Sequence, residues 1–141
     1  DTFHLCRTPG YVPTPRNRRK EIARKEKIYF YDTGIRNAIL GSFQKLELRN
    51  DAGPLFENFM IIELQKYLES RGQNPHRWFW RTHDQKEIDY LEETDGFFHA
   101  FEFKWTKGKI RTSVQKHFLE SYPGTNFQLI TGHDYYRIIS S

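Results

Sequence analysis

The sequence predicts an α/β domain with a central mixed sheet of four or five strands flanked by helices. Three observations predict it: a long helical pattern near the middle of the chain, three successive strand-like segments after it, and a second helical pattern followed by another short strand. The chain has 141 residues, enough for one hydrophobic core but too few for two independent domains. We therefore expect one domain preceded by a tail.

The tail comprises residues 1–27 and is expected to act as a connector. Proline and glycine interrupt it at four positions, and apolar periodicity is weak before Ile28. Between Arg7 and Lys27, eight basic residues stand against two acidic ones, an excess larger than the net charge of +4 of the whole chain. This basic run offers phosphate contacts, although a solvated linker is the simpler interpretation. Because the sequence begins at Asp1, we also expect a module upstream in a longer protein.

The domain is expected to begin at residue 28 with a strand and a short helix. The β-prone run KIYFY is followed by Asp32 and Thr33, either of which can cap the helix that IRNAILG suggests. The strongest helical pattern runs from about Pro54 to Arg71 and is followed by a glycine suited to end it.

Glu57 lies on the apolar stripe of this long helix, at helical spacing from Ile61, Leu64 and Leu68. A carboxylate at that position faces the interior of the domain. A favourable interaction with the helix dipole is the alternative explanation for an acidic residue in the first turns. We favour the inward-facing role, because solvent-facing positions were available for the other purpose.

The remaining elements are expected in the order strand, strand, strand, helix, strand. They occupy residues 77–82, 86–93, 97–105, 110–122 and 126–131. YYRII at residues 135–139 suggests one further strand. We assign Trp78, Trp80 and Trp105 to packing rather than to base stacking, because aromatic residues on strands usually belong to the core.

An Asp-Gly pair (95–96) predicts a two-residue hairpin turn between the second and third of these strands. Such a turn places Asp89 opposite Glu102 and Glu87 opposite Lys104, and the aromatic residues between them take the other face. Directly opposed residues have Cβ atoms about 4.5 to 5.5 Å apart, so two carboxylates there can share one divalent cation.

Asp89, Glu102 and Glu57 together form an oxygen-rich set of ligands that suits Mg²⁺ or Mn²⁺ rather than zinc. The Lys104 amine adds a movable cation that can hold a water and help to deprotonate it, while a metal stabilises charge on a phosphate oxygen. This combination describes phosphodiester hydrolysis. Ordinary ion pairs on a solvated face are the alternative, because E-x-K triplets are common on exposed strands.

Glu57, Asp89 in EIDY, and Glu102 and Lys104 in EFK resemble the pattern of the PD-(D/E)XK nuclease superfamily, whose restriction-endonuclease-like fold has the same element order. More narrowly, KIYFYDTGIRNAILG, LFENFMIIEL and KEIDYL are similar to an uncharacterised domain that follows the AAA+ module in a group of prokaryotic ATPases. The resemblance covers nearly the whole chain from about Lys27 onward.

This resemblance implies divalent-metal hydrolysis of DNA or RNA by a nuclease-like domain over residues 28–141. It implies that Asp89 and Glu102 are metal ligands, that Glu57 is an accessory ligand and that Lys104 orients the attacking water. One departure is that an isoleucine, not a proline, precedes Asp89. A catalytically silent module of the same fold, which holds nucleic acid or a protein partner for the ATPase, is the alternative function.

Lys107, Lys109 and Arg111 follow the E-x-K strand and are expected to contact a nucleic-acid backbone beside the metal. Gln115 stands where some members of the superfamily place an additional polar active-site residue. A solvated helix face is the ordinary alternative for both. The segment also contains GK, but without the upstream glycine and the following hydroxyl residue of an ATP-binding phosphate loop.

Composition indicates a cytoplasmic location. The single cysteine cannot form an internal disulfide, which fits a reducing compartment. The uninterrupted apolar runs are far shorter than the ~18 residues that a membrane span needs, so no membrane partner is expected.

Overall fold

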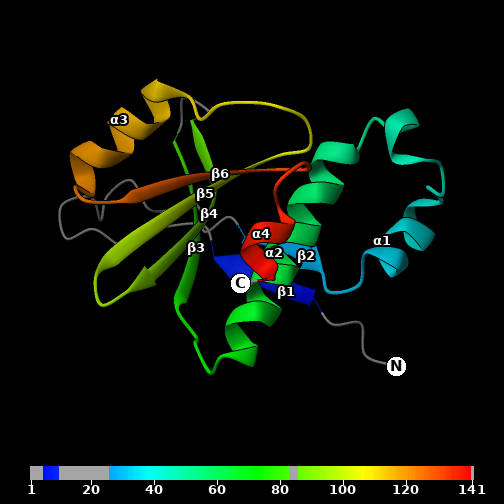
Figure 1. Ribbon diagram of the computed structural model, residues 1–141, viewed down its shortest axis with the longest axis horizontal. Helices are drawn as coiled ribbons and strands as arrows, with labels where there is room; N and C mark the ends of the chain where they lie inside the picture. Colours follow the sequence, from blue (N-terminus) through cyan, green and yellow to red (C-terminus); the bar gives the residue numbers. More distant parts are fainter. Residues whose placement is uncertain (1–4, 10–25, 83–85, 141) are drawn as a thin grey trace.

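The computed structural model describes residues 5–9, 26–82 and 86–140 and has an α/β architecture (Figure 1). A four-stranded sheet forms its centre, with helices packed on both faces, and a two-stranded sheet contacts α2 and β3. The elements in chain order are β1 (Leu5–Pro9), β2 (Glu26–Phe30), α1 (Thr33–Leu40), the 3₁₀ helix η2 (Leu46–Leu48), α2 (Ala52–Ser70), β3 (His76–Arg81), β4 (Glu87–Thr94), β5 (Phe97–Lys104), α3 (Thr112–Ser121), β6 (Asn126–Thr131) and α4 (Tyr136–Ile139).

The central sheet is mixed, as the sequence predicts, with the strand order β3-β4-β5-β6. β3, β4 and β5 are antiparallel neighbours, whereas β6 runs parallel to β5. A parallel pair needs a crossover connection, and α3 supplies it between β5 and β6. These four strands begin and end within one residue of the predicted bounds.

The helix signals in the sequence are also confirmed. The Asp32 side chain caps α1 and accepts hydrogen bonds from the backbone N–H groups of Gly34 and Ile35, at 2.7 and 3.1 Å. After α2, Gly72 has a φ of 68°, a left-handed conformation in which glycine is not strained.

Within the predicted connector over residues 1–27, the described residues form strands. Residues 5–9 form β1, which pairs antiparallel with β2, so that Thr8 lies opposite Lys27. The two strands are far apart in sequence, and pairing of that kind leaves no local periodicity for a sequence pattern to reveal. Most of the basic run, residues 10–25, lies outside the described residues.

The predicted strand at residues 135–139 is wrong, because this segment contains the short helix α4. The Asp134 carboxylate accepts hydrogen bonds from the backbone N–H and the hydroxyl of Thr131, both at 2.7 Å, and closes a turn directly after β6. The β-prone residues that follow are therefore turned out of the sheet. Tyr135, Ile138 and Ile139 pack against the core on the α2 side.

Two hydrophobic clusters cover the two faces of the central sheet. Under α2, Met60, Ile61 and Ile62 pack against aromatic residues of β4 and β5. Under α3, Val114 and Phe118 pack against the opposite face, with Trp78 and Trp80 at the margin. The tryptophan side chains thus pack against the hydrophobic core, as predicted. Fully burying one such aliphatic or aromatic side chain contributes about 1.5–3 kcal/mol, so the two clusters fix both large helices on the sheet.

One buried amide fixes β2 against α2. The Asn58 side chain donates to the carbonyl oxygen of Phe30 at 2.7 Å and accepts from the backbone N–H of the same residue at 2.8 Å. These two bonds satisfy both the backbone donor and the backbone acceptor of Phe30 at the end of β2. They also set the position of the β2 side chains that face the start of α2.

Gly132 fixes the end of β5, and we expect Gly132→Ala to destabilise the protein. Its N–H donates to the carbonyl oxygen of Lys104 at 3.2 Å, and a Cβ there would lie 2.6 Å from the carbonyl oxygen of Trp105. Backbone must therefore move, which costs about 1–3 kcal/mol. Gly53→Ala is the control, because that helical position has open space and alanine there gains up to about 1 kcal/mol. Urea unfolding of both variants measures the difference; equal midpoints would contradict the expectation.

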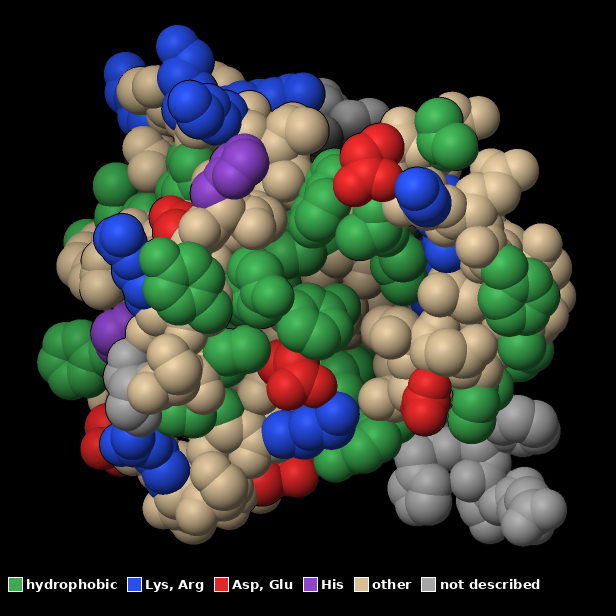
Figure 2. Space-filling view, turned by 45° about the vertical axis from the view of Figure 1, so that its right-hand side comes forward, with side chains coloured by type: hydrophobic (Ala, Val, Ile, Leu, Met, Phe, Trp, Pro, Cys, Tyr) green, Lys and Arg blue, Asp and Glu red, His purple; other side chains and the backbone are tan. Residues whose placement is uncertain are grey.

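Hydrophobic side chains are also exposed on one side of the molecule. They include Ile39, Leu40, Phe43 and Leu48 of the α1 and η2 region. Figure 2, in which the side that carries α1 is turned forward, shows hydrophobic side chains around a hollow. Within the part of the chain that the structure describes, every helix is too short or too polar to span a bilayer.

Candidate functional site

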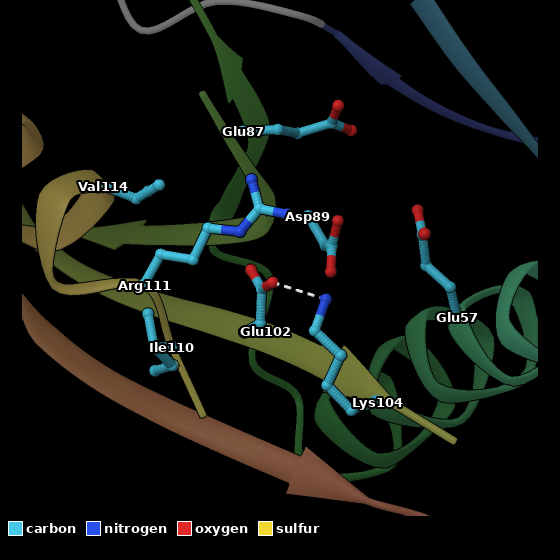
Figure 3. Close-up of a pocket in the computed structure, with 8 residues that line it drawn as sticks. All are labelled: Glu57, Glu87, Asp89, Glu102, Lys104, Ile110, Arg111 and Val114. Atoms are coloured by element: carbon cyan, nitrogen blue, oxygen red, sulfur yellow. Dashed lines mark ion pairs between the residues drawn. The ribbon is translucent and has the colours of Figure 1, made fainter. Parts of the chain in front are cut away.

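A polar cavity of about 330 Å³ lies where β4 and β5 separate at the end of their hairpin (Figure 3). The last residues paired between these two central strands are Tyr90 and Phe101, so the side chains beyond them face the gap where the strands separate. Eight residues from α2, β4, β5 and the start of α3 line the cavity. They are Glu57, Glu87, Asp89, Glu102, Lys104, Ile110, Arg111 and Val114.

The structure brings together all four residues that the sequence analysis placed in the site. Asp89 and Glu102 are each 14% exposed, and Glu57 is 23% exposed, whereas Lys104 reaches towards solvent at 44%. In Figure 3 the side chains of Glu57 and Glu102 lie on opposite sides of the cavity, with Asp89 between them. The inward orientation predicted for Glu57 on α2 is thus confirmed.

The hairpin turn that positions these strands is the predicted one. Asp95 and Gly96 both have positive φ, 53° and 81°, as a two-residue hairpin turn of type I′ requires. The pairs run from Thr94 opposite Phe97 down to Tyr90 opposite Phe101. The paired register ends one step before Asp89 and Glu102, so the predicted pairing of these two residues lies beyond the paired part of the hairpin.

A β-bulge at Asp89 is the local feature that the sequence did not reveal. Between two paired positions, β4 contains Asp89 and Tyr90 while β3 contains only Phe79. The Asp89 carboxylate then accepts a hydrogen bond from the backbone N–H of Phe103 at 3.2 Å. The bulge therefore directs this carboxylate towards the cavity.

The electrostatic environment of Asp89 opposes its ionisation. Burial raises the pKa of Asp89 to about 7, and the negative charges of Glu57 and Glu102 add to the effect. The charge of Lys27 and the N–H of Phe103 act in the opposite direction. The net effect is that the protonated form of Asp89 is favoured in the folded protein.

Lys27 and Tyr29 are site residues that the sequence analysis missed. The Lys27 ammonium lies 3.1 Å from Glu57 Oε1 and 3.8 Å from Asp89 Oδ1, and it forms a further ion pair with Glu87. The Tyr29 hydroxyl donates to Glu57 Oε1 at 2.7 Å. Alternation along KIYFY places residues 27 and 29 on one face of a strand, and this signal could have identified them.

The Lys27 ammonium stays protonated in this environment. Burial lowers the pKa of Lys27, but Glu57, Glu87 and Asp89 together raise it above its ordinary value. The aromatic ring of Phe79, with its centroid 5.2 Å away, adds a favourable cation–π contact.

Lys104 forms an ion pair with Glu102, in which its Nζ lies 2.7 Å from Oε1 (Figure 3, dashed line). Burial lowers the pKa of Lys104, yet the hydrogen bond to Glu102 makes the net change an increase. Glu87 was predicted to lie opposite Lys104, and both line the cavity, but Glu87 makes its ion pairs with Lys27 and, at 3.0 Å, with Arg81.

The residues proposed for nucleic-acid contacts divide into two groups. Arg111 lines the cavity and extends towards the carboxylates (Figure 3). Lys107 and Lys109 are exposed on the connection between β5 and α3, within a few residues of the cavity wall. Gln115 is partly buried on α3 and follows Val114, which lines the cavity, but does not line it itself.

The donor atoms at the cavity fit Mg²⁺ or Mn²⁺ by their chemistry. They are carboxylate oxygens, which hard divalent cations prefer. As the side chains stand, however, no three His, Cys, Asp or Glu residues among those described converge closely enough to form a metal-ligand set. Asp89, Glu102 and Glu57 would hold the ion only after their side chains rotate towards one another.

The fold and the cavity define an α/β domain whose carboxylate-lined site lies where the central strands β4 and β5 of a mixed sheet separate. The chain belongs to the family described as a domain of unknown function (DUF4143), which it matches over residues 52–140. That segment includes Glu57, Asp89, Glu102 and Lys104.

Two curated proteins are similar to this chain. The uncharacterized protein Rv2008c of Mycobacterium tuberculosis and the uncharacterized protein Mb2031c of Mycobacterium bovis are each 34% identical to it over 89 residues. The match covers 62% of this chain and 19% of each relative, so the matched segment spans about a fifth of their length. No solved structure matches the chain significantly.

Proposed function

We propose that this domain is a divalent-metal-dependent nuclease of the PD-(D/E)XK superfamily, with a restriction-endonuclease-like core, that hydrolyses phosphodiester bonds in DNA or RNA. The observation that carries the proposal is the convergence of Glu57, Asp89, Glu102 and Lys104, from α2, β4 and β5, on one cavity. The three carboxylates supply ligands for a cation, and the partly exposed Lys104 amine supplies a group that can accept or donate a proton.

Each side chain has a distinct task in this proposal. Asp89 and Glu102 would hold Mg²⁺ or Mn²⁺ with Glu57 as an accessory ligand, and such an ion would supply positive charge to stabilise a phosphate. Lys104 is exposed enough to hold a water at the mouth of the cavity and to orient it towards the phosphorus. Glu102 positions the Lys104 amine through their 2.7 Å ion pair.

The substrate is expected to approach along the connection between β5 and α3. Arg111 lines the cavity, and Lys107 and Lys109 are exposed nearby, so the three can contact successive phosphates of a backbone. These contacts carry no base sequence information, which is consistent with a substrate class of DNA or RNA rather than one defined site.

We further propose that the domain works as the C-terminal part of a AAA+ ATPase. The resemblance of KIYFYDTGIRNAILG and KEIDYL to the domain that follows such modules supports this, as does the much greater length of the two mycobacterial relatives. The nucleic acid and the ATPase module are then the two partners of the domain.

One observation favours a catalytically silent module as the second candidate. Lys27 and Lys104 already form ion pairs with the carboxylates, and the described side chains do not converge as a metal-ligand set. Such a module would bind nucleic acid or a protein partner without retaining a divalent ion. Divalent affinity therefore discriminates between the two functions.

Lys104→Met tests the catalytic role, and Lys66→Met is a matched control. Lys66 has similar exposure, 40% against 44%, and a similar ion pair with a glutamate, 2.8 against 2.7 Å. With Mn²⁺ present and single- and double-stranded DNA and RNA as substrates, we expect Lys104→Met to lower the cleavage rate by about 10²–10⁴-fold. The control should match the wild type, and chelator should stop all cleavage. Cleavage by Lys104→Met at the wild-type rate would remove Lys104 from the mechanism.

A further inference from the structure

We propose that the Lys27 ammonium is the resident cation of the carboxylate cluster, and that a divalent metal ion must displace it in order to bind. This inference rests on the proposed function, because both concern the same carboxylates. It assigns to Lys27 of β2 a role in controlling when a divalent metal ion can bind. Lys27 lies outside the segment matched by the family.

The Lys27 ammonium lies among carboxylates of the site. The Lys27 Nζ lies within 4.0 Å of carboxylate oxygens from both α2 and β4, at 3.1 Å from Glu57 and 3.8 Å from Asp89. Glu87 completes the set as a third carboxylate in contact with the same nitrogen. Lys104, in contrast, bonds Glu102 on the other side of the cavity. Lys27 therefore contacts two of the three proposed metal ligands, Glu57 and Asp89, whereas the third, Glu102, is paired with Lys104.

The surroundings of Lys27 favour this position. Its side chain is 21% exposed, and its ammonium packs over the Phe79 ring at 5.2 Å from the centroid. Two residues on from Lys27, Tyr29 donates to Glu57, and the amide of Asn58 fixes the end of β2 against α2. The backbone position from which the Lys27 side chain extends is thus set by the docking of a whole strand.

The consequence is competition between two cations. Mg²⁺ binds oxygen at about 2.0–2.1 Å, so an ion on Glu57 and Asp89 would lie within a few ångströms of the Lys27 nitrogen. At that distance the repulsion between the two positive charges is strong, and both need the same oxygen lone pairs. Lys27 must therefore swing away when the ion binds. In the metal-free protein, Lys27 limits the repulsion among the carboxylates.

Calorimetric titration of Mn²⁺ into the wild type and Lys27→Met tests the competition, with Lys66→Met as the control for removing a paired lysine. Removing the competing charge should tighten Mn²⁺ binding by about tenfold or more, and the control should bind as the wild type does. Thermal unfolding gives a second reading. In chelator Lys27→Met should melt below the wild type, and saturating Mn²⁺ should raise its melting temperature by more than it raises that of the wild type.

The outcomes separate this inference from the proposed function. If the wild type binds Mn²⁺ and Lys27→Met binds it equally or more weakly, the competition is overturned while the nuclease proposal stands. If none of the folded proteins binds Mn²⁺, the nuclease proposal fails and the competition fails with it. Lys27→Gln keeps a hydrogen-bond donor without the charge; should Lys27→Met not fold, this second variant must show the same tighter binding.

Discussion

Asp89→Asn is expected to stabilise the metal-free protein at pH 8 by a few kcal/mol. Asp89 has a folded-state pKa of about 7, against an ordinary value of 3.8, because it is buried beside Glu57 and Glu102. An acid whose pKa is higher in the folded state than in the unfolded state binds its proton more tightly when folded. Stability is therefore lost as the pH rises from about 4 to about 7, at about 1.4 kcal/mol for each pH unit. Asparagine lacks the charge and escapes that loss.

Urea unfolding in chelator at pH 5 and pH 8 measures this effect. The gain from Asp89→Asn should be about 1.5 kcal/mol at pH 5 and should grow until the pH passes about 7. Asp95→Asn is the control, since Asp95 is an exposed turn residue and asparagine tolerates its positive φ. A gain of equal size at both pH values, or a loss of stability at pH 8, would show that the cluster does not repel Asp89.

Glu102→Gln should lower Mn²⁺-dependent cleavage of nucleic acid by at least about a hundredfold while the protein remains folded. The substitution removes one charged ligand, and it also weakens the ion pair that positions the Lys104 amine 2.7 Å from Glu102. Both the cation and the water would then be poorly held. Initial cleavage rates at saturating Mn²⁺ are the measurement, and circular dichroism verifies the fold.

Glu120→Gln provides the matched control for this change. It makes the same chemical substitution at an exposed position on α3, away from the residues that line the cavity. Its cleavage rate should equal that of the wild type. If Glu102→Gln cleaves as fast as Glu120→Gln, Glu102 is neither a ligand nor a positioning residue, and the assignment of the site is wrong.

Local signals explain why so much of the fold could be predicted. The helical spacing of α2, the Asp-Gly turn between β4 and β5, and the alternation within β5 each specify one element through contacts close in sequence. A two-residue turn also fixes the register of the paired part of the hairpin, which ends at Tyr90 and Phe101, and the prediction extended this register by one step to Asp89 and Glu102. These local signals were enough to predict that Glu57, Asp89, Glu102 and Lys104 lie close together.

The rest depends on contacts between segments far apart in sequence. Pairing of β1 with β2 is invisible in either strand, so Lys27 was assigned to a connector although it lies against Glu57. The bulge at Asp89 results from a mismatch in length between β3 and β4, which no pattern within β4 reveals. The α4 segment has the composition of a strand, but a turn at Asp134 directs it away from the sheet.

The central claim is that the carboxylate cluster where β4 and β5 separate retains a divalent cation. Calorimetric titration of Mn²⁺ into the wild type, Glu102→Gln and Glu120→Gln tests it most directly, because it requires neither the right substrate nor an ATPase module. We expect one binding site in the wild type and in Glu120→Gln, and its loss or severe weakening in Glu102→Gln. Equal binding by all three proteins would place the ion elsewhere, and no binding by any of them would contradict the nuclease proposal and favour the silent module.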